Sequence, residues 1–120
     1  MWGVETEGAD AMSKALDQGR PVHLSAITSI ARTLGAPSVS ERTLALARKY
    51  LESVTVVPDS AAASALRFLL ERAKVLTEPA ASCTLAAADR LRGQFTADSR
   101  LVLVLCGGNT SVNDLCGYQL

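Results

Sequence analysis

Aromatic residues are scarce in this sequence, since Phe, Trp and Tyr together make up only 4% of its 120 residues. Alanine, leucine and valine must therefore fill the core. The twelve basic residues balance the twelve acidic ones and no basic run stands out, which argues against nucleic acid or a membrane surface as a partner. No apolar segment has the length of a transmembrane helix, and no signal-peptide pattern opens the sequence. We expect a soluble protein of at most one domain.

Paired cysteines are also missing. Cys83, Cys106 and Cys116 are odd in number and form no Cys-x-x-Cys motif, so a reduced, cytoplasmic protein is expected rather than a disulfide scaffold or a zinc site. Histidine occurs once, as His23, and no second candidate ligand or carboxylate clusters near it in the sequence. We expect a solvated side chain there rather than a base or a metal ligand.

Short strands and helices alternate along the chain. Short apolar runs predict the strands, and apolar residues on one helical face, bounded by capping residues, predict the helices. Residues 22–37 are irregular, and a capping-box spacing from Ser111 to Asp114 predicts a helical turn near the end. The expected strands are residues 2–5, 54–57 and 101–105, and the expected helices are residues 10–19, 38–51 (opened by a capping box from Ser38 to Glu41), 60–74 and 80–88.

The segment from Leu101 to Asn109 has the clearest pattern. Five unbroken aliphatic residues predict a short strand buried on both faces, as in a parallel sheet covered by helices. Cys106, Gly107 and Gly108 follow directly, so the chain leaves this strand through a turn without bulky side chains. Ligands of open α/β proteins bind at such strand ends. The alternative is that Cys106 is a buried packing residue beside an ordinary turn.

Alternating strands and helices predict an α/β protein with three layers, in which helices cover a parallel sheet. Three strands make a poor sheet, because both edges are exposed and the run 101–105 needs neighbours and covering layers. The first strand also begins in the middle of its pattern, at Trp2. We therefore expect residues 1–120 to be the closing part of a larger α/β domain.

Four motifs follow one another along the chain: Gly-Val-Glu-Thr at residues 3–6, Ile-Thr-Ser-Ile-Ala-x-x-Leu-Gly-Ala at 27–36, Glu-Pro-Ala at 78–80 and Cys-Gly-Gly-Asn at 106–109. Their order and spacing resemble the pyridoxal-phosphate-dependent L-serine/L-threonine dehydratases (ammonia-lyases), most closely the serine dehydratase branch. The resemblance covers essentially the whole chain. It implies the tryptophan-synthase-β-like fold (fold type II), with residues 1–120 as the C-terminal part of the large catalytic domain.

The resemblance implies four cofactor-binding residues. Cys106 matches the side chain that hydrogen-bonds the pyridine nitrogen of pyridoxal phosphate, and Gly107 and Gly108 match glycines that let the backbone pass the ring edge. A neutral thiol is a poor anchor for a pyridinium proton, which suits elimination, because the leaving hydroxyl disperses the charge. Glu78 matches an acidic residue before the helix that backs the cofactor. A helix-entry acid favoured by the helix dipole is the alternative for Glu78.

A monovalent cation is implied as well. Glu5 and Ala9 match positions of a cation site near the active centre, and Leu34 and Ala36 match loop carbonyls of the same site. One carboxylate with several carbonyl oxygens suits potassium or a similar ion. Ala11 stands where relatives often carry Ser or Asp, which removes a possible ligand and argues against a divalent ion.

The Schiff-base lysine and the Gly-rich phosphate loop of these enzymes precede the part that the chain resembles. Lys14, Lys49 and Lys74 lie on expected helices, and none is in a motif that makes it a nucleophile. The resemblance implies a homodimeric enzyme that deaminates L-serine or L-threonine, a small-molecule substrate, to pyruvate or 2-oxobutanoate, with no catalysis by this segment alone. The alternatives are a truncated, non-catalytic binding or interaction module and the same fold catalysing racemisation or β-replacement; the dehydratase-branch motifs disfavour the last.

Overall fold

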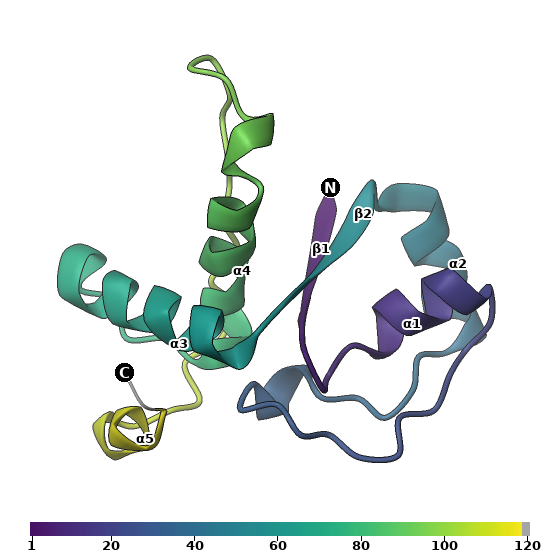
Figure 1. Cartoon of the computed structure of the whole chain (residues 1–120), viewed down its shortest axis with the longest axis horizontal. Helices are drawn as coiled ribbons and strands as arrows, with labels where there is room; N and C mark the ends of the chain where they lie inside the picture. The colour runs from purple at the N-terminus through teal and green to yellow at the C-terminus, as the bar shows by residue number, and fades with distance from the viewer. Residues whose placement is uncertain (119–120) are drawn as a thin grey trace.

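The computed structural model describes residues 1–118 and has two parallel strands at its centre (Figure 1). Strands β1 (Trp2–Thr6) and β2 (Ser53–Val57) pair along their whole length, with Val4 opposite Thr55. The two strands therefore end at the same edge of the sheet. The strands predicted at residues 2–5 and 54–57 are confirmed, each extended by one residue.

Helices lie on both sides of the strand pair, with α3 and α4 on one side and α1 and α2 on the other (Figure 1). This layered α/β arrangement confirms the predicted fold class. The α-helices are α1 (Ala11–Gln18), α2 (Glu41–Tyr50), α3 (Asp59–Phe68), α4 (Pro79–Arg90) and α5 (Val112–Gly117), and the shorter turns are η1 (Arg32–Leu34), η2 (Leu69–Ala73) and η3 (Arg92–Gln94).

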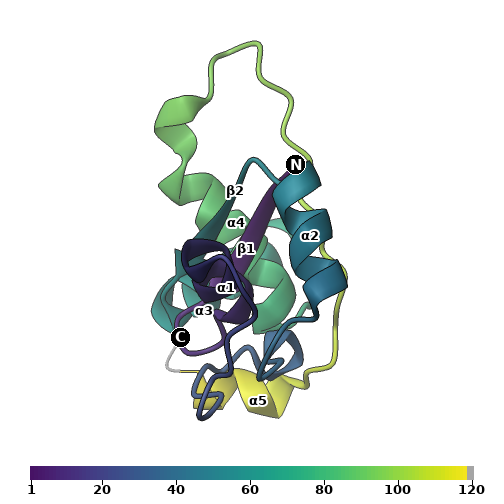
Figure 2. The ribbon, with the colours of Figure 1, turned by 90° about the vertical axis from the view of Figure 1, so that its right-hand side faces the viewer.

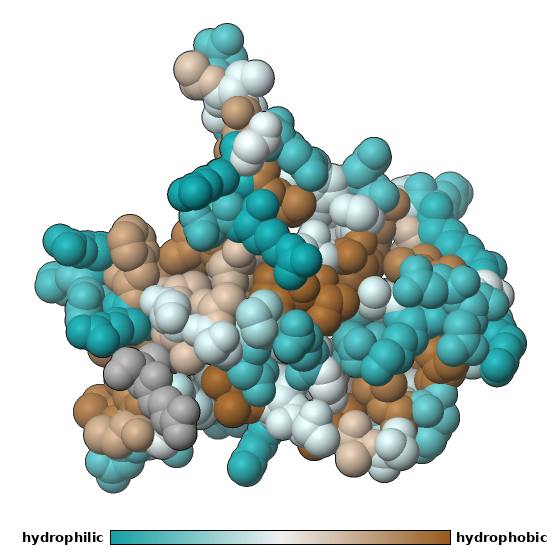
Figure 3. All heavy atoms as spheres, viewed as in Figure 1, coloured by the Kyte–Doolittle hydropathy of each residue, from teal (hydrophilic) through white to brown (hydrophobic). Residues whose placement is uncertain are grey.

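Small side chains fill the core between the sheet, α3 and α4. The buried cluster consists of Val57, Ala62, Ala65, Cys83, Ala86 and Ala87. Because most of these residues are alanines, α3 and α4 approach closely enough for the buried Ser82 hydroxyl of α4 to donate to the Ala62 carbonyl of α3 at 2.7 Å. This core cluster contains small side chains and no aromatic residue, and the two helices pack closely for that reason. Apolar residues also gather in the middle of the face seen in Figure 3, between the α3 side and the α1–α2 side.

The predicted helix ends are only partly correct. Gly19 ends α1 in the left-handed conformation, at φ 72°, which suits glycine because it lacks a Cβ atom. The capping box from Ser38 to Glu41 is wrong, because Ser40 caps the helix: its hydroxyl accepts the Thr43 amide at 3.0 Å, and α2 begins at Glu41. Farther along, α3 is α-helical only to Phe68 and continues to Ala73 as a π-helical turn.

The predicted buried strand at residues 101–105 is wrong. This stretch forms no strand, and the side chains of Val102 and Val104 are 85% and 63% exposed. Figure 2 shows it as an open trace along one edge of the molecule. A strand buried on both faces needs neighbouring strands and covering helices, and within residues 1–118 the only sheet is the pair β1–β2. No helix in the same described range is long and apolar enough to cross a membrane.

Candidate functional site

The carboxyl ends of β1 and β2 face the irregular segment 22–37. The amide of Glu7, just after β1, donates to the carbonyl of Val57 at 3.0 Å, which closes this end of the sheet. The amide of Thr28 donates to the carbonyl of Gly8 at 3.2 Å. Gly8 has φ 81°, and a Cβ there would lie 2.1 Å from the Thr28 hydroxyl oxygen. The segment therefore packs directly against the strand ends, where α/β proteins bind ligands.

The turn at residues 106–109 is fastened to the start of α4. The amide of Glu78 donates to the Gly107 carbonyl at 3.2 Å, and the hydroxyl of Thr77 donates to the same carbonyl. A Cβ on Gly107 would lie 1.7 Å from Oε1 of Glu78, so a larger residue here would require the Glu78 side chain to move. The structure thus brings together two residues that the sequence assigned to one site.

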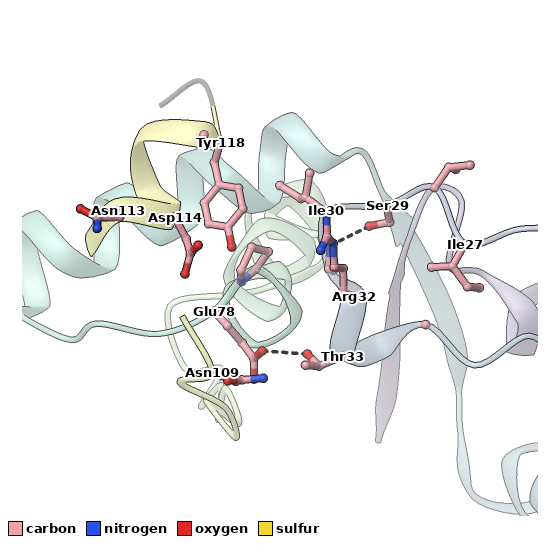
Figure 4. Close-up of a pocket in the computed structure, with 15 residues that line it drawn as sticks. Ile27, Ser29, Ile30, Arg32, Thr33, Glu78, Asn109, Asn113, Asp114 and Tyr118 are labelled. Atoms are coloured by element: carbon pink, nitrogen blue, oxygen red, sulfur yellow. Dashed lines mark hydrogen bonds between the residues drawn. The ribbon is translucent and has the colours of Figure 1, made fainter. Parts of the chain in front are cut away.

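Glu78 also binds the segment 22–37. Its Oε2 atom accepts the hydroxyl of Thr33 at 2.8 Å (Figure 4). The side chain is nearly buried, with 8% of its surface exposed. Glu78 therefore connects two segments: its backbone amide binds the glycine turn and its carboxylate binds Thr33 in the loop that follows β1 and α1.

A large cavity opens between this loop, Glu78 and α5. Its volume is about 920 Å³, and Figure 4 shows Glu78 and Thr33 on one wall, with Asp114 of α5 and Tyr118, just after α5, facing them. The predicted capping box from Ser111 to Asp114 is confirmed and fixes the start of α5. The lining is rich in polar groups, namely Ser29, Arg32, Thr33, Glu78, Asn109, Asn113, Asp114 and Tyr118. The sequence motifs pointed to Glu78 and Asn109 but not to the contribution of α5.

Cys106 is exposed and lines a second cavity of about 440 Å³. This cavity lies between β1, α4 and residues 101–106, and Gly3, Val4 and Cys83 also line it. Burial raises the pKa of the Cys83 thiol to about 11, so that Cys83 stays protonated at neutral pH. Cys83 is therefore a buried core residue, whereas Cys106 is exposed and is not part of the core.

Two of the four residues predicted to hold a cation, Glu5 and Leu34, have other hydrogen-bond partners in the structure. The two carboxylate oxygens of Glu5 accept the amides of Met12 and Ser13 at 2.9 and 2.8 Å, in the first turn of α1. Burial raises the pKa of Glu5 above its ordinary value, although these amides act in the opposite direction. The carbonyl of Leu34 accepts the amide of Ala36 at 2.9 Å. Within residues 1–118, no group of three or more His, Cys, Asp or Glu side chains could hold a metal ion.

A hydrogen-bonded network around Ser29 was not predicted. The hydroxyl of Ser29 donates to Oδ1 of Asp59 at 2.6 Å and lies 2.7 Å from the hydroxyl of Thr6. The second carboxylate oxygen of Asp59 accepts the amide of Ile30 at 2.9 Å. Ser29 belongs to the motif at residues 27–36, and Asp59 follows the predicted strand 54–57 after one proline, at a strand end where polar residues of parallel sheets gather. Neither signal predicted that the two side chains meet.

A family model described as pyridoxal-phosphate dependent enzyme matches residues 1–107. The chain belongs to this family. Its relatives include a serine dehydratase-like protein of Mus musculus, 40% identical over 88% of the chain, and the phenylserine dehydratase of Ralstonia pickettii, 38% identical over 90% of the chain. The chain spans only 35% and 33% of the lengths of these two relatives.

Solved structures of the family share the fold. The crystal structure of a T.th. threonine deaminase superimposes with a TM-score of 0.83 at 32% identity, over 92% of this chain and 39% of that one. A fungal L-serine ammonia-lyase from Rhizomucor miehei gives 0.81 at 28% identity, over 98% of this chain and 39% of that one. The resemblance to pyridoxal-phosphate enzymes of the serine and threonine dehydratase kind is thus confirmed, as is the fold.

Proposed function

We propose that this chain is the C-terminal part of the catalytic domain of a pyridoxal-phosphate-dependent L-serine/L-threonine ammonia-lyase, which deaminates serine or threonine to pyruvate or 2-oxobutanoate and ammonia. The observation that carries this proposal is the contact between Glu78 and Gly107, which joins two of the dehydratase-like motifs beside a polar cavity. We further propose that the whole protein is a cytoplasmic homodimer.

The residues around the glycine turn fit a flat, aromatic cofactor. Cys106 presents an exposed thiol at one end of the turn, and a Cβ on Gly108 would come no closer to its surroundings than 3.8 Å. The Cys106 thiol would donate a hydrogen bond to the ring nitrogen, and Gly107 and Gly108 would let the ring edge approach the backbone. When bound, pyridoxal phosphate supplies the electron-withdrawing ring that makes the α-proton of an amino acid acidic.

The described lysines do not supply the nucleophile. Lys14, Lys49 and Lys74 are all exposed, and Lys14 pairs with Asp10 at 2.9 Å. A lysine that works as a nucleophile needs a desolvated or cationic environment to lower its pKa. We therefore expect the Schiff-base lysine in a part of the polypeptide outside residues 1–120, and no turnover by this segment alone.

A potassium ion near Glu5 and Ala9, with carbonyls of Leu34 and Ala36, remains part of the proposal. A carboxylate oxygen that accepts one amide keeps a further lone pair for a cation. Glu5 would contribute such a lone pair while its amide bonds hold the start of α1 in place. A rise in activity when potassium replaces sodium, lost in Glu5→Gln, is the result that supports this site.

The exposed lysines also favour a second candidate, a non-catalytic relative that acts as a binding or interaction module. The experiment that separates the two candidates begins with the reading frame that encodes residues 1–120. Its upstream sequence is searched for an in-frame Ser-x-Lys motif and a Gly-rich loop. Their absence favours the non-catalytic module.

The activity test uses the whole polypeptide of that frame, purified with pyridoxal phosphate. Keto acid is measured after addition of L-serine or L-threonine, and the enantiomers of serine are separated in parallel. Pyruvate and 2-oxobutanoate are the expected products. Racemised serine without keto acid identifies the racemase alternative, and the absence of both products from cofactor-loaded protein contradicts the proposal. Light scattering of the same sample tests the homodimer.

A further inference from the structure

The hydrogen-bonded network around Ser29 joins three segments that lie far apart in the sequence. Thr6 is the last residue of β1, Asp59 is the first residue of α3 after β2, and Ser29 lies in the irregular segment between α1 and α2. The Ser29 hydroxyl contacts both of the other side chains, and it accepts the amide of Ala31 at 3.0 Å. The network therefore fixes the loop to the carboxyl ends of both strands.

The direction of these hydrogen bonds follows from the protons available. A serine hydroxyl carries one proton and two lone pairs, and the Ser29 proton goes to Oδ1 of Asp59. Thr6 must then donate its own proton to Ser29, because the Ser29 proton is already used. Thr6 and Ser29 are 0% and 5% exposed. All donors in this buried chain of hydroxyls therefore point toward the Asp59 carboxylate.

The backbone held by this network forms a wall of the cavity of about 920 Å³. Ser29, Ile30 and Ala31 all line that cavity. The Ile30 amide donates to Oδ2 of Asp59, and the Ala31 amide donates to the Ser29 hydroxyl. Residues 29–31 belong to no helix or strand, and within the described chain the carbonyls of Ile30 and Ala31 accept only the amides of Arg32 and Leu34 in the same loop. The bonds that tie this wall to the strand ends are therefore those of Asp59 and Ser29. Thr33 and Glu78 fasten the next turn.

We infer that Asp59, through Ser29, is a positioning residue for the amino-acid substrate: it holds residues 29–31 at the place where they border the polar cavity. This inference rests on the proposed function and adds the substrate-side wall to it. The carboxylate acts through the loop and does not itself enter the reaction. Its loss should weaken substrate binding more than it slows the chemical step.

The test compares four variants of the whole protein. Asp59→Ala removes both acceptors, and Ser29→Ala removes the hydroxyl while leaving an acid at the start of α3. Asp59→Asn is the rescue, because its amide oxygen can accept from Ile30 and its amide nitrogen can donate to Ser29, whose own proton then turns to the Thr6 hydroxyl. Asp89→Ala is the matched control, since Asp89 is an exposed acid on α4 that only pairs with Arg92 at 3.6 Å.

Two readouts are combined. Hydrogen exchange of the Ile30 and Ala31 amides should speed up by about tenfold or more in Asp59→Ala and Ser29→Ala, since each loses buried hydrogen-bond partners. The KM for L-serine or L-threonine should rise by about tenfold in the same variants with a smaller change in kcat, as expected for lost ground-state binding. Asp59→Asn and Asp89→Ala should stay close to the parent in both measurements.

Unchanged amide exchange in Asp59→Ala overturns the inference, because the loop then does not depend on the carboxylate. Faster exchange with an unchanged KM overturns it as well, because the loop then does not position the substrate. A parent protein that binds cofactor but forms no keto acid disproves the proposed function instead. In that case calorimetric binding of L-serine replaces KM, and equal affinity in parent and Asp59→Ala overturns the inference separately.

Discussion

At Gly107 the space for a side chain is already occupied by the Glu78 carboxylate, 1.7 Å from the position of a Cβ. Gly107→Ala must therefore push Glu78 away from Thr33 or distort the turn. We expect a loss of about 1–3 kcal/mol in the free energy of unfolding, the usual cost of overpacking. Gly93→Ala is the control, because nothing lies within 4 Å of a Cβ there. Equal denaturant midpoints for the two variants would contradict the contact.

Cys106 is the residue whose chemistry can be tested most directly in the whole protein. Cys106→Ser should keep most of the cofactor affinity, because a hydroxyl can donate to the same ring nitrogen. Cys106→Ala should weaken binding of pyridoxal phosphate by about 1–3 kcal/mol, the cost of an unpaired polar group. Cys106→Asp should hold the nitrogen protonated, slow elimination and raise side reactions such as racemisation. The dissociation constants of pyridoxal phosphate for the three variants test this role. If Cys106→Ala binds the cofactor as tightly as the parent protein, Cys106 does not bond the ring nitrogen.

Individual site residues were predictable from the sequence only as separate motifs. Cys106, Gly107 and Glu78 were named from the resemblance, and the contact of Glu78 with Gly107 became visible only through the hydrogen bond to the Gly107 carbonyl. The contact between Asp59 and Ser29 was missed, although Ser29 lies in the motif at residues 27–36. Their hydrogen bond joins positions 30 residues apart, and neither helical nor strand periodicity carries information about such a contact.

At the scale of elements, the start of α2 offers a test of capping. Ser40→Ala should cost about 1 kcal/mol in the free energy of unfolding, because it leaves the Thr43 amide without its acceptor. Ser38→Ala is the matched control, since the Ser38 hydroxyl only donates weakly to its neighbour Val39 at 3.4 Å. Unfolding curves of both variants give the comparison. A larger loss in Ser38→Ala would restore the capping box that the sequence suggested.

Local patterns predicted most elements, while those that depend on distant partners failed. The strands at β1 and β2 and the alanine-rich α4 follow from residue type and spacing, and Gly19 fixed the end of α1. Residues 101–105 have the same local pattern as a buried strand but lie exposed. Burial on both faces depends on neighbouring strands and helices, which local residue spacing cannot supply.

At the scale of the whole molecule, an unfinished sheet predicts low stability. The sheet has two strands within the described residues, so each strand has a free edge, and the aliphatic side chains of residues 101, 102, 104 and 105 are exposed. We expect the isolated chain to have a free energy of unfolding of only ~0–4 kcal/mol, below the usual range for domains. A cooperative melt above about 65 °C would contradict this, since ordinary domains rarely exceed that temperature.

The same exposed stretch should bind a hydrophobic dye, and one substitution can locate the binding. Val102 is 85% exposed, so Val102→Lys removes apolar surface without opening a core, and dye fluorescence should fall while the unfolding midpoint stays within experimental error. Ala97→Lys adds the same charge at an exposed position in the preceding turn and should leave the fluorescence unchanged. An equal fall in both variants would mean that charge alone repels the dye. A fall only in Val102→Lys identifies residues 101–105 as the apolar surface that the isolated chain leaves uncovered.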